Sequence, residues 1–261
     1  MLHIERSGDG PPVLLLHGAA GSAATYDWLP DLGRTVVRMD FRGHGRSGRA
    51  DSYLLGDYVE DALSVLRELG PAAVAGHSLG GVVAWTLAQR VPELVSAIVL
   101  EDPPLFMGSP EGHASNRAIP GFETMRDMVV RWQADGMDIA RAAALLAASP
   151  YRADPSRRTS DVVAPDASAA RASAMLHLDP AVLDAVIDGS ALAGTDTDAP
   201  VTVPALILAA GIVPAFAVEH QQRLGRTHPQ VDVRRVDGAA HVIHDEIAHR
   251  DEYLRTLVER L

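Results

Sequence analysis

The sequence predicts an α/β fold, in which helices flank a mostly parallel, twisted sheet and one helical segment is inserted. Short apolar runs that suit buried strands alternate with longer stretches of helical spacing. Apolar residues make up 47% of the 261 residues, enough to build a large buried sheet. Between about residues 105 and 202 the strand-like runs stop and helical stretches follow one another.

Six apolar runs are expected to form the parallel strands. Each is only five to seven residues long, and glycine, proline or aspartate follows most of them, as expected where a buried strand ends. The expected strands are residues 12–16, 35–39, 72–76, 96–101, 204–210 and 231–236.

Helices are expected between the strands and throughout the insertion. Residues 58–69 place four apolar side chains on one face, and Gly70-Pro71 ends that stretch. The other expected helices are residues 81–90, 122–134, 137–148, 167–178, 180–187 and 247–261. We therefore expect a core of residues 1–104 and 203–261, with an all-helical cap of residues 105–202 over the carboxyl edge of the sheet.

The composition excludes several classes of chemistry. The chain has no cysteine and no lysine, because all 23 basic residues are arginine. Thiolate nucleophiles, disulfides, lysine Schiff bases and the P-loop lysine are therefore absent. A net charge of −11 argues against nucleic-acid or membrane partners. The first residues lack the apolar core of a secretory signal, and no apolar run is long enough to span a bilayer, so we expect a cytoplasmic protein.

The stretch AGHSLGG, residues 75–81, contains the candidate nucleophile Ser78. A serine on a sharp turn from strand to helix is exposed, and the next backbone N–H points toward the same space. Such a turn crowds the neighbouring chain, so Gly76 and Gly80 suit the positions two residues to either side. The alternative is a glycine-rich turn with an idle serine.

The loop HGAAGS, residues 17–22, follows the first predicted strand and is the candidate oxyanion loop. We expect the N–H groups of Ala19 and Leu79 to stabilise an oxyanion together. Gly18 and His77 flank these positions and are candidate substrate contacts. An ordinary glycine turn is the alternative for residues 17–22.

Among eleven histidines, His241 follows the last predicted strand and precedes the closing helix. That order places it on a loop at the carboxyl edge of the sheet, where it could take the Ser78 proton and return it to a leaving group. A metal cluster of His241, His244 and His249 is the competing interpretation, but the spacing is not that of known zinc motifs. We expect no metal and no cofactor.

The motifs HGAAGS, DFRGHGRSG, AGHSLGG and DGAAH, in this order, resemble those of the α/β-hydrolase superfamily. The resemblance covers about residues 1–105 and 200–261 and implies a serine esterase or lactonase with an α/β-hydrolase fold. It is weak across the insertion, which is similar to a cap domain.

The sequence departs from the superfamily in its triad acid. Most members carry an aspartate just after the strand here expected at residues 204–210, where this chain has Val213. Zearalenone-lactonase-like enzymes take their acid from the end of an earlier strand, and that resemblance implies Asp102. Glu101 is the alternative, and because adjacent strand residues point in opposite directions, one of the two is expected to reach His241.

The sequence favours hydrolysis of a small apolar ester or lactone by Ser78, His241 and Asp102, in a monomer or homodimer. Trp132 is the candidate pocket residue of the cap. Two other functions remain open: a ligand-binding or sensor protein with little turnover, and a C–C hydrolase or lyase of secondary metabolism.

Overall fold

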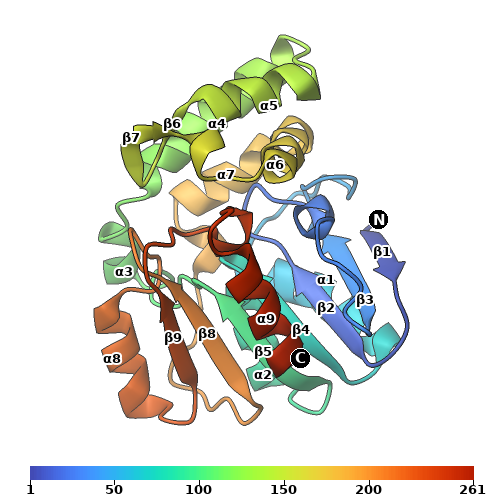
Figure 1. Ribbon diagram of the computed structural model, residues 1–261. Helices are drawn as coiled ribbons and strands as arrows, with labels where there is room; N and C mark the ends of the chain where they lie inside the picture. The colour runs from blue at the N-terminus through green and yellow to red at the C-terminus, as the bar shows by residue number, and fades with distance from the viewer.

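The computed structural model describes residues 1–261, and a seven-stranded sheet runs through its centre (Figure 1). The strand order is β1-β3-β2-β4-β5-β8-β9. β1 runs antiparallel to β3, and every other neighbouring pair is parallel. The strands are β1 (His3–Ser7), β2 (Pro12–Leu16), β3 (Thr35–Asp40), β4 (Ala72–His77), β5 (Val95–Glu101), β8 (Ala205–Ala210) and β9 (Asp232–Val236). The predicted α/β-hydrolase fold, with its mostly parallel sheet, is confirmed.

The edge strand β1 was not among the expected strands. Its sequence, HIERS, is mostly polar and partly exposed, so no apolar run reveals it. It pairs with β3 in antiparallel register, His3 opposite Asp40 and Ile4 opposite Met39. An edge strand needs burial on one side only, which explains why tertiary pairing rather than hydrophobicity defines it.

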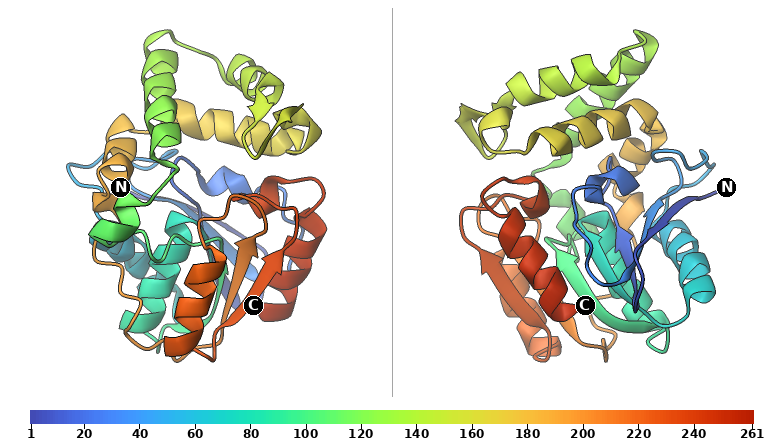
Figure 2. Two further views of the ribbon diagram at one scale, coloured as in Figure 1. Left: turned by 90° about the vertical axis from the view of Figure 1, so that its left-hand side faces the viewer. Right: turned by 45° about the vertical axis from the view of Figure 1, so that its right-hand side comes forward.

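Helices cover both faces of the sheet (Figures 1 and 2). The helices α1 (Leu55–Leu69), α2 (Leu79–Arg90) and α8 (Val218–Thr227) lie on one face, and α9 (Arg250–Arg260) lies on the other with the 3₁₀ turn η1 (Ala23–Tyr26). Strand side chains alternate between the two resulting cores: Leu14 and Leu16 pack toward α1 and α2, whereas Val13 and Leu15 pack toward α9. None of the helices combines the length and the apolar character needed to cross a membrane.

The insertion lies over the carboxyl edge of the sheet, between β5 and β8 (Figure 2). It contains α3 (Pro110–Ala114), α4 (Ile119–Ala134), α5 (Ile139–Ala148), α6 (Pro165–His177) and α7 (Pro180–Ile187). Three further 3₁₀ turns are η2 (Thr159–Asp161), η3 (Ser190–Leu192) and η4 (Ile243–Asp245), the last of them in the core. That residues 105–202 form a separate unit stays a prediction.

The expectation of an all-helical insertion was wrong. A short hairpin of β6 (Pro150–Tyr151) and β7 (Asp154–Arg158) separates α5 from α6, with Tyr151 opposite Asp154. The segment is polar, contains two prolines and lacks alternating apolar residues, so no strand pattern marks it. Hydrogen bonds between Ser149 and Thr159 close its base instead.

Candidate active site

Ser78 occupies a sharp turn between β4 and α2. Its backbone has φ 51° and ψ −115°, which is unusual for a residue other than glycine. A Cβ added to Gly76 would lie 2.2 Å from the carbonyl oxygen of Gly80, and one added to Gly80 would lie 2.2 Å from that of Leu16. The two glycines therefore allow the chain to pass close to itself while the serine is held in a strained conformation.

His241 lies on the loop between β9 and α9, and its ring reaches Ser78. Its Nε2 is 3.1 Å from Ser78 Oγ, although 163 residues separate the two. The side chain is 35% exposed, so the ring is open to solvent on one side. An imidazole nitrogen at this distance can accept the serine proton.

Asp102, the first residue after β5, binds the other nitrogen of that ring. His241 Nδ1 is 2.7 Å from Asp102 Oδ2, and the carboxylate is fully buried. The backbone N–H groups of Ala210, Ala215 and Phe216 also donate to it, at 3.2, 2.7 and 3.1 Å. Burial alone would raise the pKa of Asp102, but the hydrogen bond and charge of His241 and the N–H donors hold that pKa below its usual value.

Glu101 points to a different histidine. Its Oε2 lies 2.5 Å from His244 Nδ1, and its Oε1 accepts the backbone N–H of His244 at 3.0 Å. Both side chains are buried. Burial opposes the charged form of His244, but the carboxylates of Glu101 and Asp245 raise its pKa. Glu101 thus fixes the 3₁₀ turn η4 to the sheet and forms no hydrogen bond with His241.

The loop after β8 has Val213 where the triad aspartate was expected, and it contributes backbone donors to Asp102 instead. Val213 is 64% exposed and has φ 46°, a conformation that is strained for a β-branched residue. The following residues turn their N–H groups inward, so that Ala215 and Phe216 donate to Asp102. These two donors were missed by the sequence reasoning, because backbone donors leave no residue-type signature.

The candidate oxyanion loop lies against the nucleophile turn. A Cβ added to Gly18 would be 2.5 Å from His77 Nδ1 and 3.2 Å from Ser78 Cβ, so this close approach requires glycine. The N–H of Ala19 donates to no protein acceptor. Leu79 is the first residue of α2, where a helix leaves its N–H groups without intrahelical partners. Both N–H groups are thus available to a ligand.

His77 is turned toward the loop of His241. Its Nε2 is 3.0 Å from the carbonyl oxygen of His241, and the two ring centroids are 4.8 Å apart. Burial and the neighbouring histidines lower the pKa of His77 well below its usual value, so the neutral ring donates to that carbonyl. His77 and Gly18 are both buried, and the predicted substrate contacts of these two residues stay predictions.

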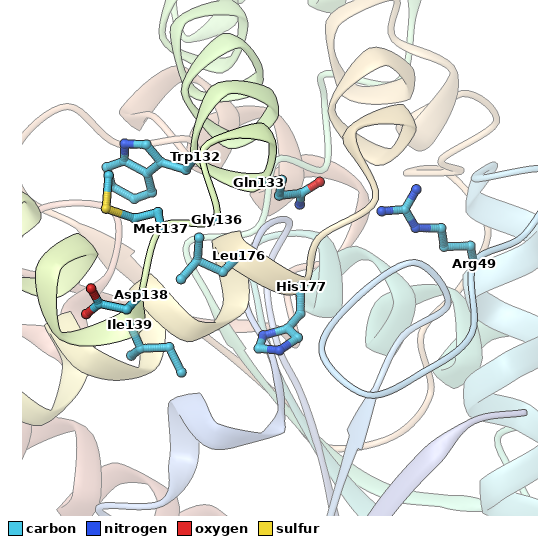
Figure 3. Close-up of a pocket in the computed structure, with 9 residues that line it drawn as sticks. All are labelled: Arg49, Trp132, Gln133, Gly136, Met137, Asp138, Ile139, Leu176 and His177. Carbon is cyan, nitrogen blue, oxygen red and sulfur yellow. The ribbon is translucent and has the colours of Figure 1, made fainter.

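Trp132 lines a groove to which Ser78 does not contribute. It lies near the end of α4, is 6% exposed and lines a groove of about 600 Å³ that is formed mostly by the cap (Figure 3). Arg49 from the core and Met137, Leu176 and His177 from the cap also line this groove, whereas none of the residues around Ser78 does. Its role in a substrate pocket stays a prediction.

The three histidines of the competing metal interpretation do not converge. His241 binds Asp102 and His244 binds Glu101, while His249 Nε2 lies 3.6 Å from Glu246. No group of three or more His, Cys, Asp or Glu side chains has the proximity that a metal ion requires. Each ring instead has its own carboxylate partner.

Two buried contacts of the His241 loop were also missed. Glu246 accepts hydrogen bonds from Ala240 N–H and from the hydroxyl of Tyr151, both at 2.7 Å. The sequence pattern gives no signal for this pair, because Tyr151 lies in the unexpected hairpin, 95 residues before its partner.

Comparison with known proteins relates this geometry to one family. The family model described as alpha/beta hydrolase fold matches residues 11–247. An esterase of Mycobacterium tuberculosis is 35% identical over 140 residues, which cover 47% of each chain. The 2-(acetamidomethylene)succinate hydrolase of Mesorhizobium japonicum is 34% identical over 109 residues, 39% of this chain and 38% of the hydrolase. The chain thus spans about half or less of the length of these curated relatives.

Two solved structures are similar over nearly the whole chain. An E-2-(acetamidomethylene)succinate hydrolase has a TM-score of 0.71 at 22% identity, covering 99% of this chain and 94% of that one. The enol-lactonase from Burkholderia xenovorans LB400 has a TM-score of 0.72 at 21% identity, covering 99% and 95%. At these identities the likeness concerns the fold.

Proposed function

The chain belongs to the alpha/beta hydrolase fold family, and from this premise we propose that it cleaves a carboxylic ester or lactone of a small apolar molecule. The observation that carries the proposal is the hydrogen-bonded series from Ser78 Oγ to His241 Nε2 and from His241 Nδ1 to Asp102 Oδ2, at 3.1 and 2.7 Å. Relatives that bear the names esterase, hydrolase and enol-lactonase support hydrolysis as the reaction class.

The first half of the reaction transfers the acyl group to the protein. Ser78 Oγ attacks the ester carbonyl carbon while its proton passes to His241 Nε2, and the carbonyl oxygen becomes an oxyanion. Ala19 and Leu79 N–H groups stabilise this oxyanion, and one such donor contributes about 3 kcal/mol to transition-state stabilisation in related chemistry. The tetrahedral adduct collapses as the alcohol oxygen leaves and takes the proton from His241. In a lactone the alcohol stays attached to the acyl chain.

The second half releases the acid. A water molecule attacks the Ser78 ester and gives one proton to His241, which then protonates Ser78 Oγ as the acyl–oxygen bond breaks. Asp102 holds the imidazole with Nδ1–H toward the carboxylate and stabilises its positive form. Because three backbone N–H groups already hold Asp102, it does not reorganise during the cycle.

Chemical labelling tests this proposal. A fluorophosphonate should react with the native protein, and peptide mass spectrometry should place the adduct on Ser78. Ser78→Ala should abolish labelling and lower kcat for a short-chain aryl ester by roughly 10³-fold or more. Saturable ligand binding without product, unchanged in Ser78→Ala, would instead favour a sensor protein. That alternative arose from the missing aspartate at Val213, and the Asp102–His241 hydrogen bond weakens it.

A further inference from the structure

The loop that carries His241 is attached to the cap as well as to the sheet. One oxygen of Glu246, Oε1, accepts the hydroxyl of Tyr151 at 2.7 Å and the N–H of Ala240 at 2.7 Å. Tyr151 belongs to β6 of the cap hairpin, and Ala240 directly precedes His241. A single carboxylate oxygen therefore joins the cap to the backbone of the candidate general base.

The acceptor of this joint is buried, and the donating Tyr151 is half-buried. Glu246 is 3% exposed, so solvent does not replace its partners. Burial and the carboxylate of Glu246 raise the pKa of Tyr151 above its usual value, which keeps its hydroxyl protonated and able to donate. A hydrogen bond from a neutral hydroxyl to a buried carboxylate is among the stronger kinds in proteins.

Further contacts fasten the same segment to the cap. Residues 162–164 and 245–247 pair as a short antiparallel bridge, with Ala164 N–H donating to Asp245 O and Ile247 N–H to Val162 O, both at 2.9 Å. Arg250 binds the Asp166 carboxylate with two nitrogens, at 2.8 and 3.0 Å. In both views of Figure 2 the hairpin lies above this loop. A shift of the cap would therefore move the loop.

The sheet holds the loop from the opposite side. Glu101 binds the backbone and ring of His244, and His77 donates to the carbonyl oxygen of His241 at 3.0 Å. His241 thus sits on backbone that is fixed from below by the sheet and from above by the cap. Proton transfer requires its Nε2 to stay within about 3.2 Å of Ser78 Oγ, so small movements of this backbone matter.

We propose that Tyr151 is a positioning residue. Through its hydrogen bond to Glu246, it couples the position of the cap to the orientation of the His241 ring. The inference rests on the proposed function for its catalytic consequence. The hydrogen bonds of Glu246 stand independently of that function.

Several titratable or charged groups lie close to Glu246, Tyr151 and His241, and they affect the pH profile of kcat/KM. His249 of the helix α9 N-terminus lies 3.6 Å from Glu246 Oε2, and Arg157 of β7 and Asp245 of η4 influence Tyr151. Asp102 and His77 face His241 itself. The test therefore combines a pH profile with the Nδ1–H signal of His241, which its loss in Asp102→Asn distinguishes from the Nδ1–H signal of His244 beside Glu101.

Tyr151→Phe removes the hydroxyl and keeps the ring. We expect kcat for an aryl ester to fall roughly 10-fold with KM changed less than about 2-fold, because orientation rather than binding is lost. We also expect the apparent pKa of the kcat/KM profile to shift. In the proton NMR spectrum, the downfield signal of His241 Nδ1–H should broaden or move.

The chain offers a matched control at another junction of core and cap. Tyr53 donates to the Asp179 carboxylate at 2.7 Å, and neither residue forms a hydrogen bond or an ion pair with the His241 loop. Tyr53→Phe should lower stability but leave kcat, its pH profile and the His241 signal unchanged. Equal effects of the two variants would overturn the proposal, since cap attachment in general would then explain them.

A second variant approaches the joint from the other partner. Glu246→Ala removes the hydrogen bonds of both Tyr151 and Ala240, so its kcat should fall at least as far as that of Tyr151→Phe. The double variant should lose little more than Glu246→Ala alone. Glu246→Gln keeps an acceptor oxygen and should retain most of kcat. If Tyr151→Phe does not fold, the comparison of Glu246→Gln with Glu246→Ala tests the proposal in its place. Equal kcat values for these two variants would overturn the proposal. The NMR signal requires no turnover, so failure of the coupling is distinguishable from failure of the hydrolase assignment.

Discussion

Glu101 and Asp102 are adjacent in the chain, yet their carboxylates bind different histidines. Asp102 Oδ2 lies 2.7 Å from His241 Nδ1, and Glu101 Oε2 lies 2.5 Å from His244 Nδ1. Glu101 is the last residue of β5, whereas Asp102 follows it with φ 42°. The alternation of the strand and the turn after it send the two side chains to separate partners.

Asp102→Asn should therefore impair catalysis far more than Glu101→Gln. The asparagine cannot hold the Nδ1–H tautomer of His241 as a carboxylate does, so we expect kcat to fall roughly 10²–10⁴-fold. Steady-state kinetics on an aryl ester measure this. Circular dichroism should show that both variants are folded.

Glu101→Gln serves as the matched control for this experiment. It removes a buried charge beside His244, so we expect a lower free energy of unfolding and a much smaller loss of kcat. The reverse order of the two kcat values would transfer the role of triad acid to Glu101.

Acidification should destabilise the protein between about pH 6.5 and pH 4. Burial lowers the pKa of His17 to about 4, and its ring is held neutral, with Nδ1–H donating to Gly18 O and Nε2 accepting Phe41 N–H. Between these pH values His17 is protonated in the unfolded chain but stays neutral in the folded chain. The free energy of unfolding therefore falls as the pH falls. His17 alone contributes about 3 kcal/mol to this loss. Burial lowers the pKa of His44 to about 3, which acts in the same direction.

Urea unfolding at pH 7, 5 and 4 measures this effect. His17→Gln should be less stable at pH 7 but should lose less free energy of unfolding on acidification. His177→Gln replaces an exposed histidine and should leave the pH dependence unchanged. If His17→Gln showed the same pH dependence as the parent protein, His17 would not be the source.

Gly80→Ala should destabilise the protein severely. The new methyl group would lie 2.2 Å from the backbone oxygen of Leu16, and this backbone cannot yield as a flexible side chain could. We expect a loss of about 3 kcal/mol or more in the free energy of unfolding. Gly225→Ala, inside α8 with open space around it, should instead stabilise by about 0.5–1 kcal/mol. Thermal and urea unfolding compare the two, and a tolerated Gly80→Ala would contradict the described turn.

Val213→Gly should stabilise the protein by about 1 kcal/mol, because glycine adopts positive φ without the strain of a β-branched side chain. The valine is largely exposed, so little burial is lost. Val218→Gly is the control: Val218 is 50% exposed but begins α8, where glycine should destabilise. Equal destabilisation by both substitutions would argue against strain at Val213.

Much of the core could be predicted because burial leaves a pattern in the sequence. The five inner strands β2, β3, β4, β5 and β8 are largely apolar runs, since both faces of a parallel sheet are covered. The edge strand β9 was also predicted, although two arginines interrupt its apolar residues. The polar edge strand β1 and the hairpin of β6 and β7 were not predicted from the sequence, because backbone pairing rather than burial of apolar side chains forms them. Trp132 is a further example. Its residue type suits a pocket wall, but the packing of the helices decides which pocket it lines.

The sequence by itself determined the local elements: a serine between two glycines at a turn from strand to helix, and a histidine and two carboxylates at the ends of other strands. These depend on chain neighbours, which a sequence states directly. The tertiary structure alone decided which carboxylate meets which histidine, which N–H groups hold Asp102, and that Tyr151 reaches Glu246. Those contacts join residues about 95 to 163 positions apart, and their distances depend on how the sheet and the cap pack together.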